Sequence, residues 1–509
     1  MIRRYLRLVL GSRDLFVRPV PADVIAGLSV ALVVVPQSLA YADLAGMPPH
    51  LGLFAAAVPP IAAALVASSP YLQTGPVALT SLLTFGALSG LAEPGSREYI
   101  ELAAILALVV GVVRLGLGLV RLGLVAFLMS EPVLVGFTTA AAIVIVASQL
   151  PAAVGVMAEG DGVLERAGWT IVHPGEWEGG AIGFSLLTAA CVFGFRRIHP
   201  LIPGVLIAVV TALVISVASG YDGAVVGALP DDLPSLDFDH PIGDLGSIVA
   251  SGVIIALVGF AEPASISRIF AAEDRRPWSP NREFASQGLA NLASGAVGAF
   301  PVGGSFSRSS LNRLAGARTR WSGAVTGFAV LIFLPFVEVL DDLPRAVLAA
   351  VVISAVLKLI DLPALVSFWR LSRAQALVAW LTFAATLVLT PRVDIAVLVG
   401  ISASIAVHLW RELQLRSDWV VDGDVLTVRP QGVFWFASVP RIGQTLVHQL
   451  GEHPDARELR IDLSGVGRID YTAKTFLLQL VDEVADETGL EVNLINIPEH
   501  ARRVLGLDP

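Results

Sequence analysis

The sequence predicts an α-helical polytopic membrane protein of about 14 spans, arranged as a 7+7 inverted repeat and followed by a small cytoplasmic α/β domain. Three observations predict this fold. The 509-residue chain is 55% hydrophobic and only 15% charged, with a mean hydropathy of +0.74, whereas soluble proteins carry roughly 25% charged residues. Apolar stretches of roughly spanning length recur from Val24 to about Leu409. After Trp410 the composition changes to that of a soluble domain.

The fourteen expected spans follow one another in two sets of seven. The first set lies near Val24–Ala45, Gly52–Val66, Thr74–Leu91, Ile100–Val120, Leu122–Leu150, Ala181–Phe195 and Ile202–Ser219. The second set lies near Ile248–Phe270, Phe284–Phe300, Ser305–Leu314, Trp321–Val339, Pro344–Leu359, Ala374–Leu389 and Val393–Leu409.

The charges between the spans alternate in sign. The loops expected in the cytoplasm are basic and hold Arg114, Arg121, Arg196, Arg197, Arg275, Arg276, Arg282, Arg313, Arg318, Arg320, Lys358, Arg370 and Arg373. The loops expected outside are acidic, with Glu159–Glu178, Asp222, Asp231, Asp232, Asp237, Asp239, Glu338, Asp341 and Asp342. By the positive-inside rule, both termini are therefore expected in the cytoplasm, at the plasma (inner) membrane.

Two of the expected spans are interrupted at their start. In Pro301–Leu314 (PVGGSFSRSSLNRL), Gly303 and Gly304 do not easily continue a helix, and Ser305 is a candidate N-cap. In Gln73–Thr84 (QTGPVALTSLLT), Thr74 is the candidate cap, with Gly and Pro where a helix would begin.

Two helices that start in mid-membrane leave two sets of unpaired N–H groups there. Such groups are tolerated at that depth only where they line a cavity, and the helix dipoles favour an anion. Paired interruptions of this kind point to the binding site of a transporter. They fall in the third and tenth spans, each the third of seven, which predicts two inverted repeats of seven divided at the Pro- and Asp-rich linker 220–246.

The domain prediction has six parts. They are a lead-in (1–20), the first repeat (21–219), an external linker (220–246), the second repeat (247–410), a polar linker (411–423) and the α/β domain (424–509). In the last part, strands are expected at Asp424–Arg429, Val433–Phe436, Glu458–Leu463 and Glu491–Ile495, and helices at Val439–Leu450, Ala473–Glu487 and Glu499–Leu505.

These segments resemble a known family over essentially the whole chain. Asp23–Leu53 (DVIAGLSVALVVVPQSLAYADLAGMPPHLGL) resembles the first span of the sulfate permease (SulP) family, called solute carrier 26 in animals. TGPVALTSLL and GGSFSRSSLN are similar to its two half-helices, and the C-terminal part resembles the STAS domain. The resemblance implies fourteen spans divided into UraA-like core and gate domains, dimerisation, and transport of sulfate, bicarbonate, chloride or small dicarboxylates.

In the tenth span, Phe306, Ser307 and Arg308 align with the family's anion-coordinating triplet. Physically, Ser307 offers a hydroxyl and an N–H, and Arg308 adds a permanent positive charge beside the helix dipole. The competing interpretation is that the serines only cap the helix, Ser305 included, while Arg308 snorkels or pairs with Glu262. No second basic residue is expected near this site.

Two further segments are expected to face the same anion. The third span is expected to present backbone N–H groups across from Ser307 over the segment Thr74–Ala78, which comprises Thr74, Gly75, Pro76, Val77 and Ala78; a Pro-initiated helix packed on its neighbours is the alternative. In the first span, Pro36 is expected to break the helix and expose Gln37, Ser38 and Tyr41. By the family pattern Gln37 and Tyr41 contact the anion, although Gln37 could instead make a hydrogen bond between helices.

Glu262 is the acid in the otherwise apolar eighth span, LVGFAEPASIS. A buried carboxylate of this kind carries protons or binds sodium, and the family places a residue linked to cation coupling here. A structural ion pair with Arg308 is the alternative. The expected coupling ion is H⁺, or else Na⁺; no cofactor or metal is expected, because Cys191 is the single cysteine and no Walker loop or HExxH motif occurs.

The STAS-like segment SGVGRIDYTAKT carries Tyr471 and Thr472 after Asp470, where soluble relatives have a phosphorylatable Ser. Thr472 is therefore expected to cap a helix, and the domain is interpreted as regulatory or dimer-supporting.

The function predicted is secondary active transport of a small anion (sulfate, bicarbonate or a dicarboxylate) by cation-coupled symport, in a homodimer within the lipid bilayer and without nucleic-acid partners. The alternatives are an uncoupled anion channel or an exchanger of the same family, a nucleobase permease, which the Arg308 charge disfavours, and a membrane enzyme, for which no catalytic constellation is present.

Overall fold

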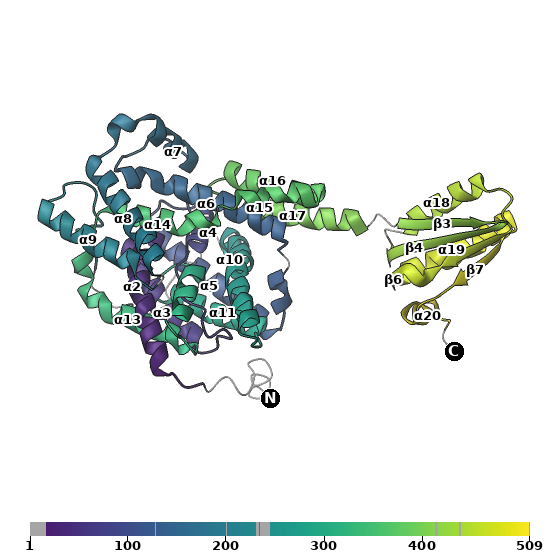
Figure 1. The fold of residues 1–509 in the computed structure, drawn as a ribbon, viewed down its shortest axis with the longest axis horizontal. Coiled ribbons are helices and arrows are strands. Elements are labelled where there is room, and N and C mark those ends of the chain that lie inside the picture. Colours follow the sequence, from purple (N-terminus) through teal and green to yellow (C-terminus); the bar gives the residue numbers. More distant parts are fainter. Residues whose placement is uncertain are drawn as a thin grey trace. The chain divides into compact units, whose positions relative to one another are not determined.

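The computed structural model describes residues 17–127, 129–199, 201–230, 234, 245–412, 416–436 and 439–507. The chain divides into two compact units, Met1–Ser402 and Ala403–Pro509. The first unit is helical and the second is an α/β domain, and their elements are labelled in Figure 1.

Helices form nearly all of the first unit. In chain order they are α2 (Pro21–Leu44), α3 (Pro49–Ala64), α4 (Ala78–Leu88), α5 (Arg97–Leu119), α6 (Glu131–Val154), α7 (Val163–Val172), α8 (Gly179–Ile198), α9 (Gly204–Ser219), α10 (Leu245–Glu273), α11 (Pro280–Ala296), α12 (Phe306–Leu314), α13 (Trp321–Phe333), α14 (Arg345–Val356), α15 (Leu362–Leu371), α16 (Arg373–Val388) and α17 (Val393–Glu412), the last reaching into the second unit. Each expected span overlaps one of these helices. In the described part of the chain, α7 and α15 are the helices that the sequence did not predict.

Eight helical segments of the described residues are long and apolar enough to cross a membrane, and α3, α4, α9 and α16 are shorter apolar helices. The remaining two spans, α11 and α12, carry many polar side chains. The short α4 and α12 each follow an extended segment, β1 (Thr74–Gly75) and β2 (Gly303–Gly304). Both extended segments are buried, so each of these two helices is preceded by buried backbone.

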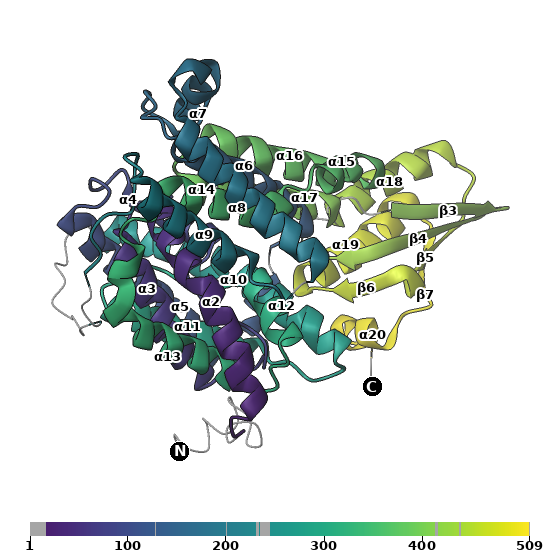
Figure 2. The same cartoon turned by 60° about the vertical axis from the view of Figure 1, so that its left-hand side comes forward.

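The helices pack in two groups, which can be followed in Figures 1 and 2. One group contains α2, α3, α5, α10, α11 and α13, with α5 lying along α11 and α3 along α13. The other contains α6, α8, α9, α14 and α16, with α6 contacting both α14 and α16. The order helix–helix–strand–half-helix–helix occurs twice in the first group, as α2–α3–β1–α4–α5 and as α10–α11–β2–α12–α13.

Helix α2 continues through Pro36, so the expected break there is wrong. A proline inside a helix removes one backbone hydrogen bond, and neighbouring helices in a bundle tolerate that loss. The start of α2 is fixed instead by Asp23, which is fully buried and accepts hydrogen bonds from the amides of Val20, Arg318 and Thr319. The first helix is thus tied to the turn that precedes α13.

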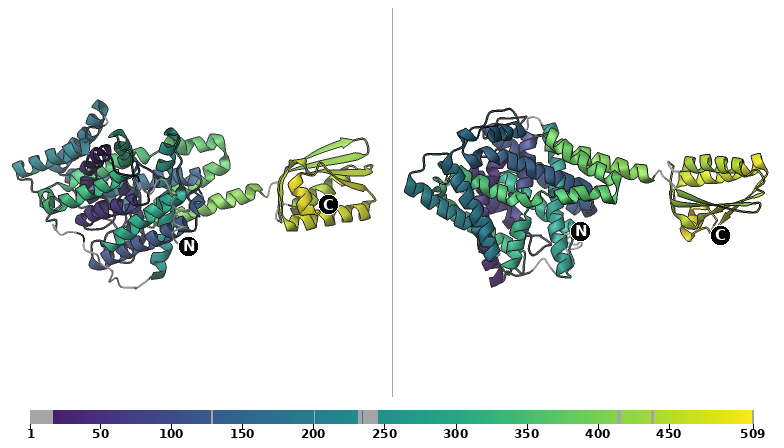
Figure 3. Two further views of the ribbon diagram at one scale, coloured as in Figure 1. Left: turned by 90° about the horizontal axis from the view of Figure 1, so that it is seen from below. Right: turned by 45° about the horizontal axis from the view of Figure 1, so that its top comes forward.

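The second unit is a five-stranded sheet with three helices (Figure 3). Its strands are β3 (Arg416–Asp422), β4 (Val425–Phe434), β5 (Glu458–Asp462), β6 (Val466–Ile469) and β7 (Glu491–Ile495), and its helices are α18 (Val439–Glu452), α19 (Tyr471–Thr488) and α20 (Glu499–Leu505). The path β3–β4–β5–β7 starts with an antiparallel hairpin and continues in parallel, and β6 joins the second half of β4. Leu426, Leu459, Leu477 and Ala501 lie in its apolar core.

Three expectations for this unit are wrong. Residues 416–422, assigned to a linker, form β3. The two strands expected at 424–436 are one strand, β4. In the described part of the chain, β5 pairs with Val425–Val428 and β6 with Gly432–Phe434, so Pro430 lies between the two pairings, where its missing N–H is not needed by either strand. Helix α19 is capped by Asp470, whose carboxylate accepts from the amide of Ala473 at 2.7 Å, and not by Thr472.

An ion pair between buried Asp462 and half-exposed Arg429 ties the parallel strands β4 and β5 together. Asp462, at the end of β5, accepts from Arg429 of β4 at 2.8 Å and from the amide of Ser464 at 2.9 Å. Burial alone would raise the pKa of Asp462, but the hydrogen bonds from Ser464 and Arg429 lower that pKa to about 2. The pair therefore stabilises the fold above about pH 4, and this contribution is lost as the pH falls toward 2.

Candidate functional site

The two interrupted segments meet inside the first unit. Strands β1 and β2 pair antiparallel, with Thr74 opposite Gly304 and Gly75 opposite Gly303. The amide of Ser305 extends this ladder by donating to the carbonyl of Gln73 at 3.0 Å. The sequence expectation that residues about 230 positions apart lie together is thus met in the structure, and both half-helices start from one crossing point.

The first of these starts, that of α4, has no side-chain cap. Its N-cap is Val77, in an extended conformation and without a capping hydrogen bond, so the expectation that Thr74 caps this helix is wrong. Thr74 lies in β1, and its hydroxyl accepts from Nε2 of Gln287 at 2.7 Å. The first-turn amides of α4, beginning at Ala78, are left without a capping side chain.

The second start, that of α12, is capped from two sides. Oγ of Ser305 accepts from the amide of Arg308 at 3.4 Å, which confirms Ser305 as the N-cap. Oε1 of Glu262 accepts from the amide of Phe306 at 3.3 Å. The amide of Ser307, which lies between these two amides, makes no hydrogen bond to a side chain in the described part of the chain.

The side chains of this start differ in exposure. Phe306 is half exposed, and its ring stacks on Phe270 of α10 at 6.2 Å between centroids. Ser307 is exposed as well. Phe306 therefore offers an apolar wall beside the helix start, while Ser307 offers polar groups that a ligand can reach.

Arg308 bridges the two starts. Its side chain is 1% exposed, and Nη2 donates to the carbonyl of Pro76, just before α4, at 2.8 Å. Among the described residues, its buried Nε and Nη1 atoms have no hydrogen-bond partner, and Glu262 does not lie within ion-pair distance. The alternative of an Arg308–Glu262 ion pair is therefore not what the structure shows. A guanidinium with unused donors is held where two helix N-termini meet.

Two residues of α2 face this point and one does not. Tyr41 is 5% exposed and lies within electrostatic range of both Arg308 and Glu262. Gln37, also 5% exposed, lies one turn earlier on the same face of α2, which packs against α12. Ser38 is fully buried against α3, where its carbonyl approaches Gly52, so its expected exposure to the cavity is wrong.

A polar face of α11, which the sequence analysis missed, supports both strands. Gln287 holds Thr74, and Asn291 binds both backbone groups of Val302: Oδ1 accepts from its amide at 2.9 Å and Nδ2 donates to its carbonyl at 3.1 Å. Both side chains are fully buried. Polar residues at i and i+4 within the expected span Phe284–Phe300 were the available signal.

Arg114 does not lie in the loop to which the sequence pattern assigned it. It lies in α5 and is fully buried, so its assignment to a cytoplasmic loop is wrong. Its guanidinium donates to the carbonyls of Ile255 and Ala256 in α10 and to that of Val302 beside β2. The expectation of no second basic residue near the site is therefore wrong as well. An arginine inside the expected span Ile100–Val120 was the signal.

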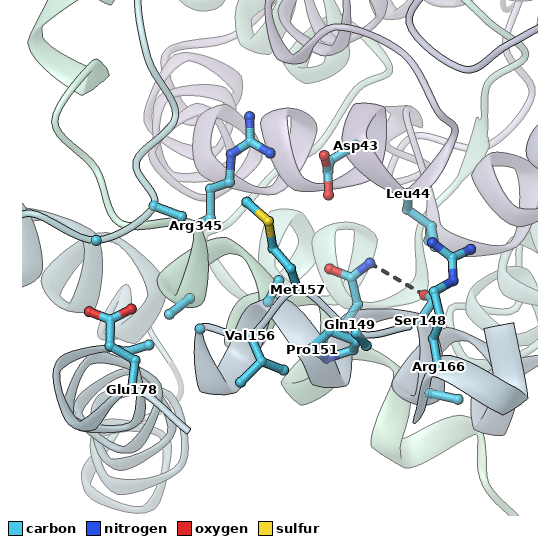
Figure 4. Close-up of a pocket in the computed structure, with 18 of the residues that line it drawn as sticks. Asp43, Leu44, Ser148, Gln149, Pro151, Val156, Met157, Arg166, Glu178 and Arg345 are labelled. Carbon is cyan, nitrogen blue, oxygen red and sulfur yellow. Dashed lines mark hydrogen bonds between the residues drawn. The ribbon is translucent and has the colours of Figure 1, made fainter. Parts of the chain in front are cut away.

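A cavity of about 770 Å³ lies beside the C-terminal end of α2 (Figure 4). Charged side chains from several elements line it, among them Asp43, Arg166, Glu178 and Arg345. None of the predicted site residues lines this cavity, although all of them are described. It is therefore separate from the crossing point of β1 and β2.

The fold is that of known anion transporters. Over 99% of this chain and 90% of that chain, it matches murine solute carrier 26 family member A9 in the inward-facing state, with a TM-score of 0.88 and 21% identity. The transmembrane domain of the cyanobacterial bicarbonate transporter BicA matches over 77% of this chain and 99% of that domain, with a TM-score of 0.66 and 22% identity. The protein is thus a helical multi-pass membrane protein of this fold, with a C-terminal α/β domain.

The sequence comparisons identify the family. The model of the sulfate permease family matches residues 21–382, and the STAS domain model matches residues 417–507. The chain belongs to the sulfate permease family, whose members are transporters of anions and not enzymes. It is 34% identical to "Probable sulfate transporter Rv1739c" of Mycobacterium tuberculosis, over 76% of this chain and 69% of that protein. It is 33% identical to "Probable sulfate transporter 4.2" of Arabidopsis thaliana, over 93% of this chain and 76% of that protein.

Proposed function

We propose that this protein transports sulfate by alternating access, with the anion bound between the N-termini of α4 and α12. One observation carries the proposal: the guanidinium of Arg308 is buried at the junction of the two helix starts, and its Nε and Nη1 make no hydrogen bond to the residues that the structure describes. Buried donors without partners are rare in proteins, and a bound ion is one of the reasons for which they are retained. Relatives named as sulfate transporters support sulfate as the anion.

The chemistry of the junction suits a compact anion with several acceptor oxygens. Two helix dipoles point their positive ends at one place, and the amide of Ser307 and the starting amides of α4 supply N–H donors. Arg308 adds a full charge and a forked donor geometry. In this proposal Gln37 and Tyr41 of α2 contact the anion in addition to the starts of α4 and α12.

Glu262 provides a way to couple the anion to a proton. Its carboxylate already occupies the amide of Phe306, so it holds a place that the substrate anion would use. When Glu262 takes up a proton, it loses its negative charge and no longer repels the anion. The positive charge of Arg308 then attracts the anion without competition from the Glu262 carboxylate. We infer that Glu262 and the anion are linked, and that H⁺ accompanies sulfate in symport.

The experiment for the binding site is uptake of labelled sulfate into proteoliposomes. We expect the single variant Arg308→Gln and the double variant Ser307→Ala/Arg308→Gln each to reduce uptake about 100-fold. The reason is that a charge-assisted hydrogen bond to a buried ion contributes about 1.5–3 kcal/mol. Arg97→Gln, the same change at an exposed arginine at the start of α5, is the matched control and leaves uptake intact. Wild-type uptake in the double variant would exclude the site.

The coupling is tested by pH. We expect wild-type sulfate uptake to rise as the outside is made more acidic, because protonation of Glu262 removes a charge that repels the anion. Glu262→Gln is expected to bind sulfate at all pH values and to lose pH-driven accumulation. Accumulation driven by pH that survives Glu262→Gln would reject H⁺ coupling through this residue. Uptake that never exceeds equilibrium in the wild-type protein would instead identify an uncoupled channel.

We further propose cytoplasmic termini, placement in the plasma (inner) membrane and a homodimer. The alternating charges of the loops support the orientation, and the family supports the dimer. Cys191 is the single cysteine of the chain, so its replacement gives a cysteine-free background. Cysteines placed singly at Asp222 and Arg275 are expected to react with an impermeant reagent from outside and from inside, respectively. The reverse labelling would overturn the orientation.

A further inference from the structure

The starting observation is a second buried arginine behind the crossing point of the two strands. Arg114 has no exposed surface, and its three donor nitrogens are each used: Nε donates to the carbonyl of Ala256 at 3.0 Å, Nη2 to that of Ile255 at 3.1 Å, and Nη1 to that of Val302 at 2.9 Å. Gly259 of α10 makes room for it, since a Cβ there would lie 2.7 Å from Nη2. The glycine at this position of α10 therefore leaves the space that the Arg114 guanidinium occupies.

The charge of Arg114 is solvated but not cancelled. Carbonyl oxygens are dipoles, and in the described part of the chain no Asp or Glu lies within ion-pair distance of its guanidinium. By contrast, Arg313 of α12 is paired with Glu273 and Asp274. A buried arginine without a counter-charge is expensive in a membrane protein, so a structural role for the hydrogen bonds alone explains it poorly.

The position of Arg114 connects it directly to the site. Val302, which accepts from Nη1, is followed by Gly303, the residue that pairs with Gly75. An added Cβ on Gly75 would lie 3.4 Å from Nη2 of Arg308. Two guanidinium groups therefore flank the β1–β2 crossing: Arg308 with donors left free, and Arg114 with its donors used by the backbone.

We propose that Arg114 sets the preference of the site for divalent over monovalent anions; this rests on the proposed function. Arg114 does not touch the anion and acts through its charge. The interaction of a fixed charge with an anion is proportional to the anion's charge. Removing the Arg114 charge therefore lowers the affinity for a monoanion by some factor and the affinity for a dianion by about the square of that factor.

The experiment measures affinities of purified protein in lipid nanodiscs by calorimetry, with sulfate and selenate as dianions and nitrate and chloride as monoanions. For Arg114→Gln we expect about a threefold to tenfold loss for the monoanions and about a tenfold to hundredfold loss for the dianions. Arg114→Met is the second neutral variant and follows the same pattern. Arg282→Gln is the matched control, because Arg282 is also buried and donates to backbone carbonyls, those of Val66 and Ala67.

Arg114→Lys separates charge from packing, since lysine keeps the charge but loses the fork. We expect it to weaken both anion classes alike, with their affinity ratio unchanged within about twofold. Equal losses for both classes in Arg114→Gln, a changed ratio in Arg114→Lys, or the same change of ratio in Arg282→Gln would each overturn the proposal. If the wild-type protein binds none of the four anions, the proposed function itself fails, which is a different outcome from equal losses.

Discussion

The two helix starts that meet at the crossing point are built differently. The start of α12 carries a side-chain cap, a carboxylate and a buried guanidinium, from Ser305, Glu262 and Arg308. The start of α4 contributes none of these: its N-cap is Val77, which makes no side-chain capping hydrogen bond. The two helix starts therefore provide different chemical groups to the crossing point.

This difference separates two sources of anion affinity. The α12 side contributes charge through side chains, whereas the α4 side contributes backbone amides, whose position depends on the shape of the chain before them. Side-chain substitutions should then be most damaging in α12, and changes of backbone geometry most damaging before α4. Three substitutions test this comparison.

Of these three substitutions, Gly75→Ala has the largest expected effect. Gly75 has a φ of 154°, which only glycine adopts readily, so alanine would introduce strain of about 1–3 kcal/mol and shift the strand. The new Cβ would also lie in van der Waals contact with Nη2 of Arg308, at 3.4 Å. We expect sulfate affinity to fall about 30-fold, although no polar side chain is removed, as measured by calorimetry on the purified protein.

Gly90→Ala is the matched control for this change. Gly90 lies in the turn after α4 and has no atom within 4 Å of an added Cβ. Its replacement should leave affinity and thermal stability unchanged. Normal sulfate affinity in Gly75→Ala would mean that the backbone before α4 does not shape the site.

The fold was predictable from the sequence where local patterns decide it. Apolar length located the spans, and Gly-Gly and Gly-Pro located the two interruptions because these residues disfavour helix. The pattern failed where partners far along the chain decide the outcome. Pro36 does not break α2, since the surrounding helices hold it. Strand β3 has polar residues at four of its seven positions and was assigned to a linker, although its pairing with β4 makes it a strand.

The site was predictable in part for the same reason. Ser305 as a cap follows from its own sequence position, and it is confirmed. Arg114, Gln287 and Asn291 lie on helices other than the interrupted ones and reach the crossing point only through packing. Their polarity inside expected spans showed that they have buried partners, but the sequence does not say which backbone groups those partners are.

A smaller effect is expected from Ser305→Ala on the α12 side. The substitution removes the cap on the amide of Arg308, which contributes about 1 kcal/mol, so the first turn that carries Ser307 and Arg308 is held less firmly. We expect sulfate affinity to fall about fivefold by calorimetry. Ser279→Ala is the control, because Ser279 caps α11 with the same 3.4 Å contact to an amide away from the crossing. Equal losses in the two variants would show that the effect is general destabilisation.

The smallest expected effect comes from giving α4 the cap that it lacks. Val77→Thr keeps the shape of the side chain and places a hydroxyl where it can accept from a first-turn amide. That amide is then shared between the hydroxyl and the anion, so we expect about a twofold loss of sulfate affinity together with a slightly higher thermal stability. Val302→Thr, which adds the same hydroxyl beside the other strand and away from a helix start, should not show this combination. If Val77→Thr gains stability at unchanged affinity, the amides of α4 do not bind the anion, and the asymmetry between the two starts is complete: α12 alone would hold the substrate, and α4 would serve only to position Arg308 through the carbonyl of Pro76.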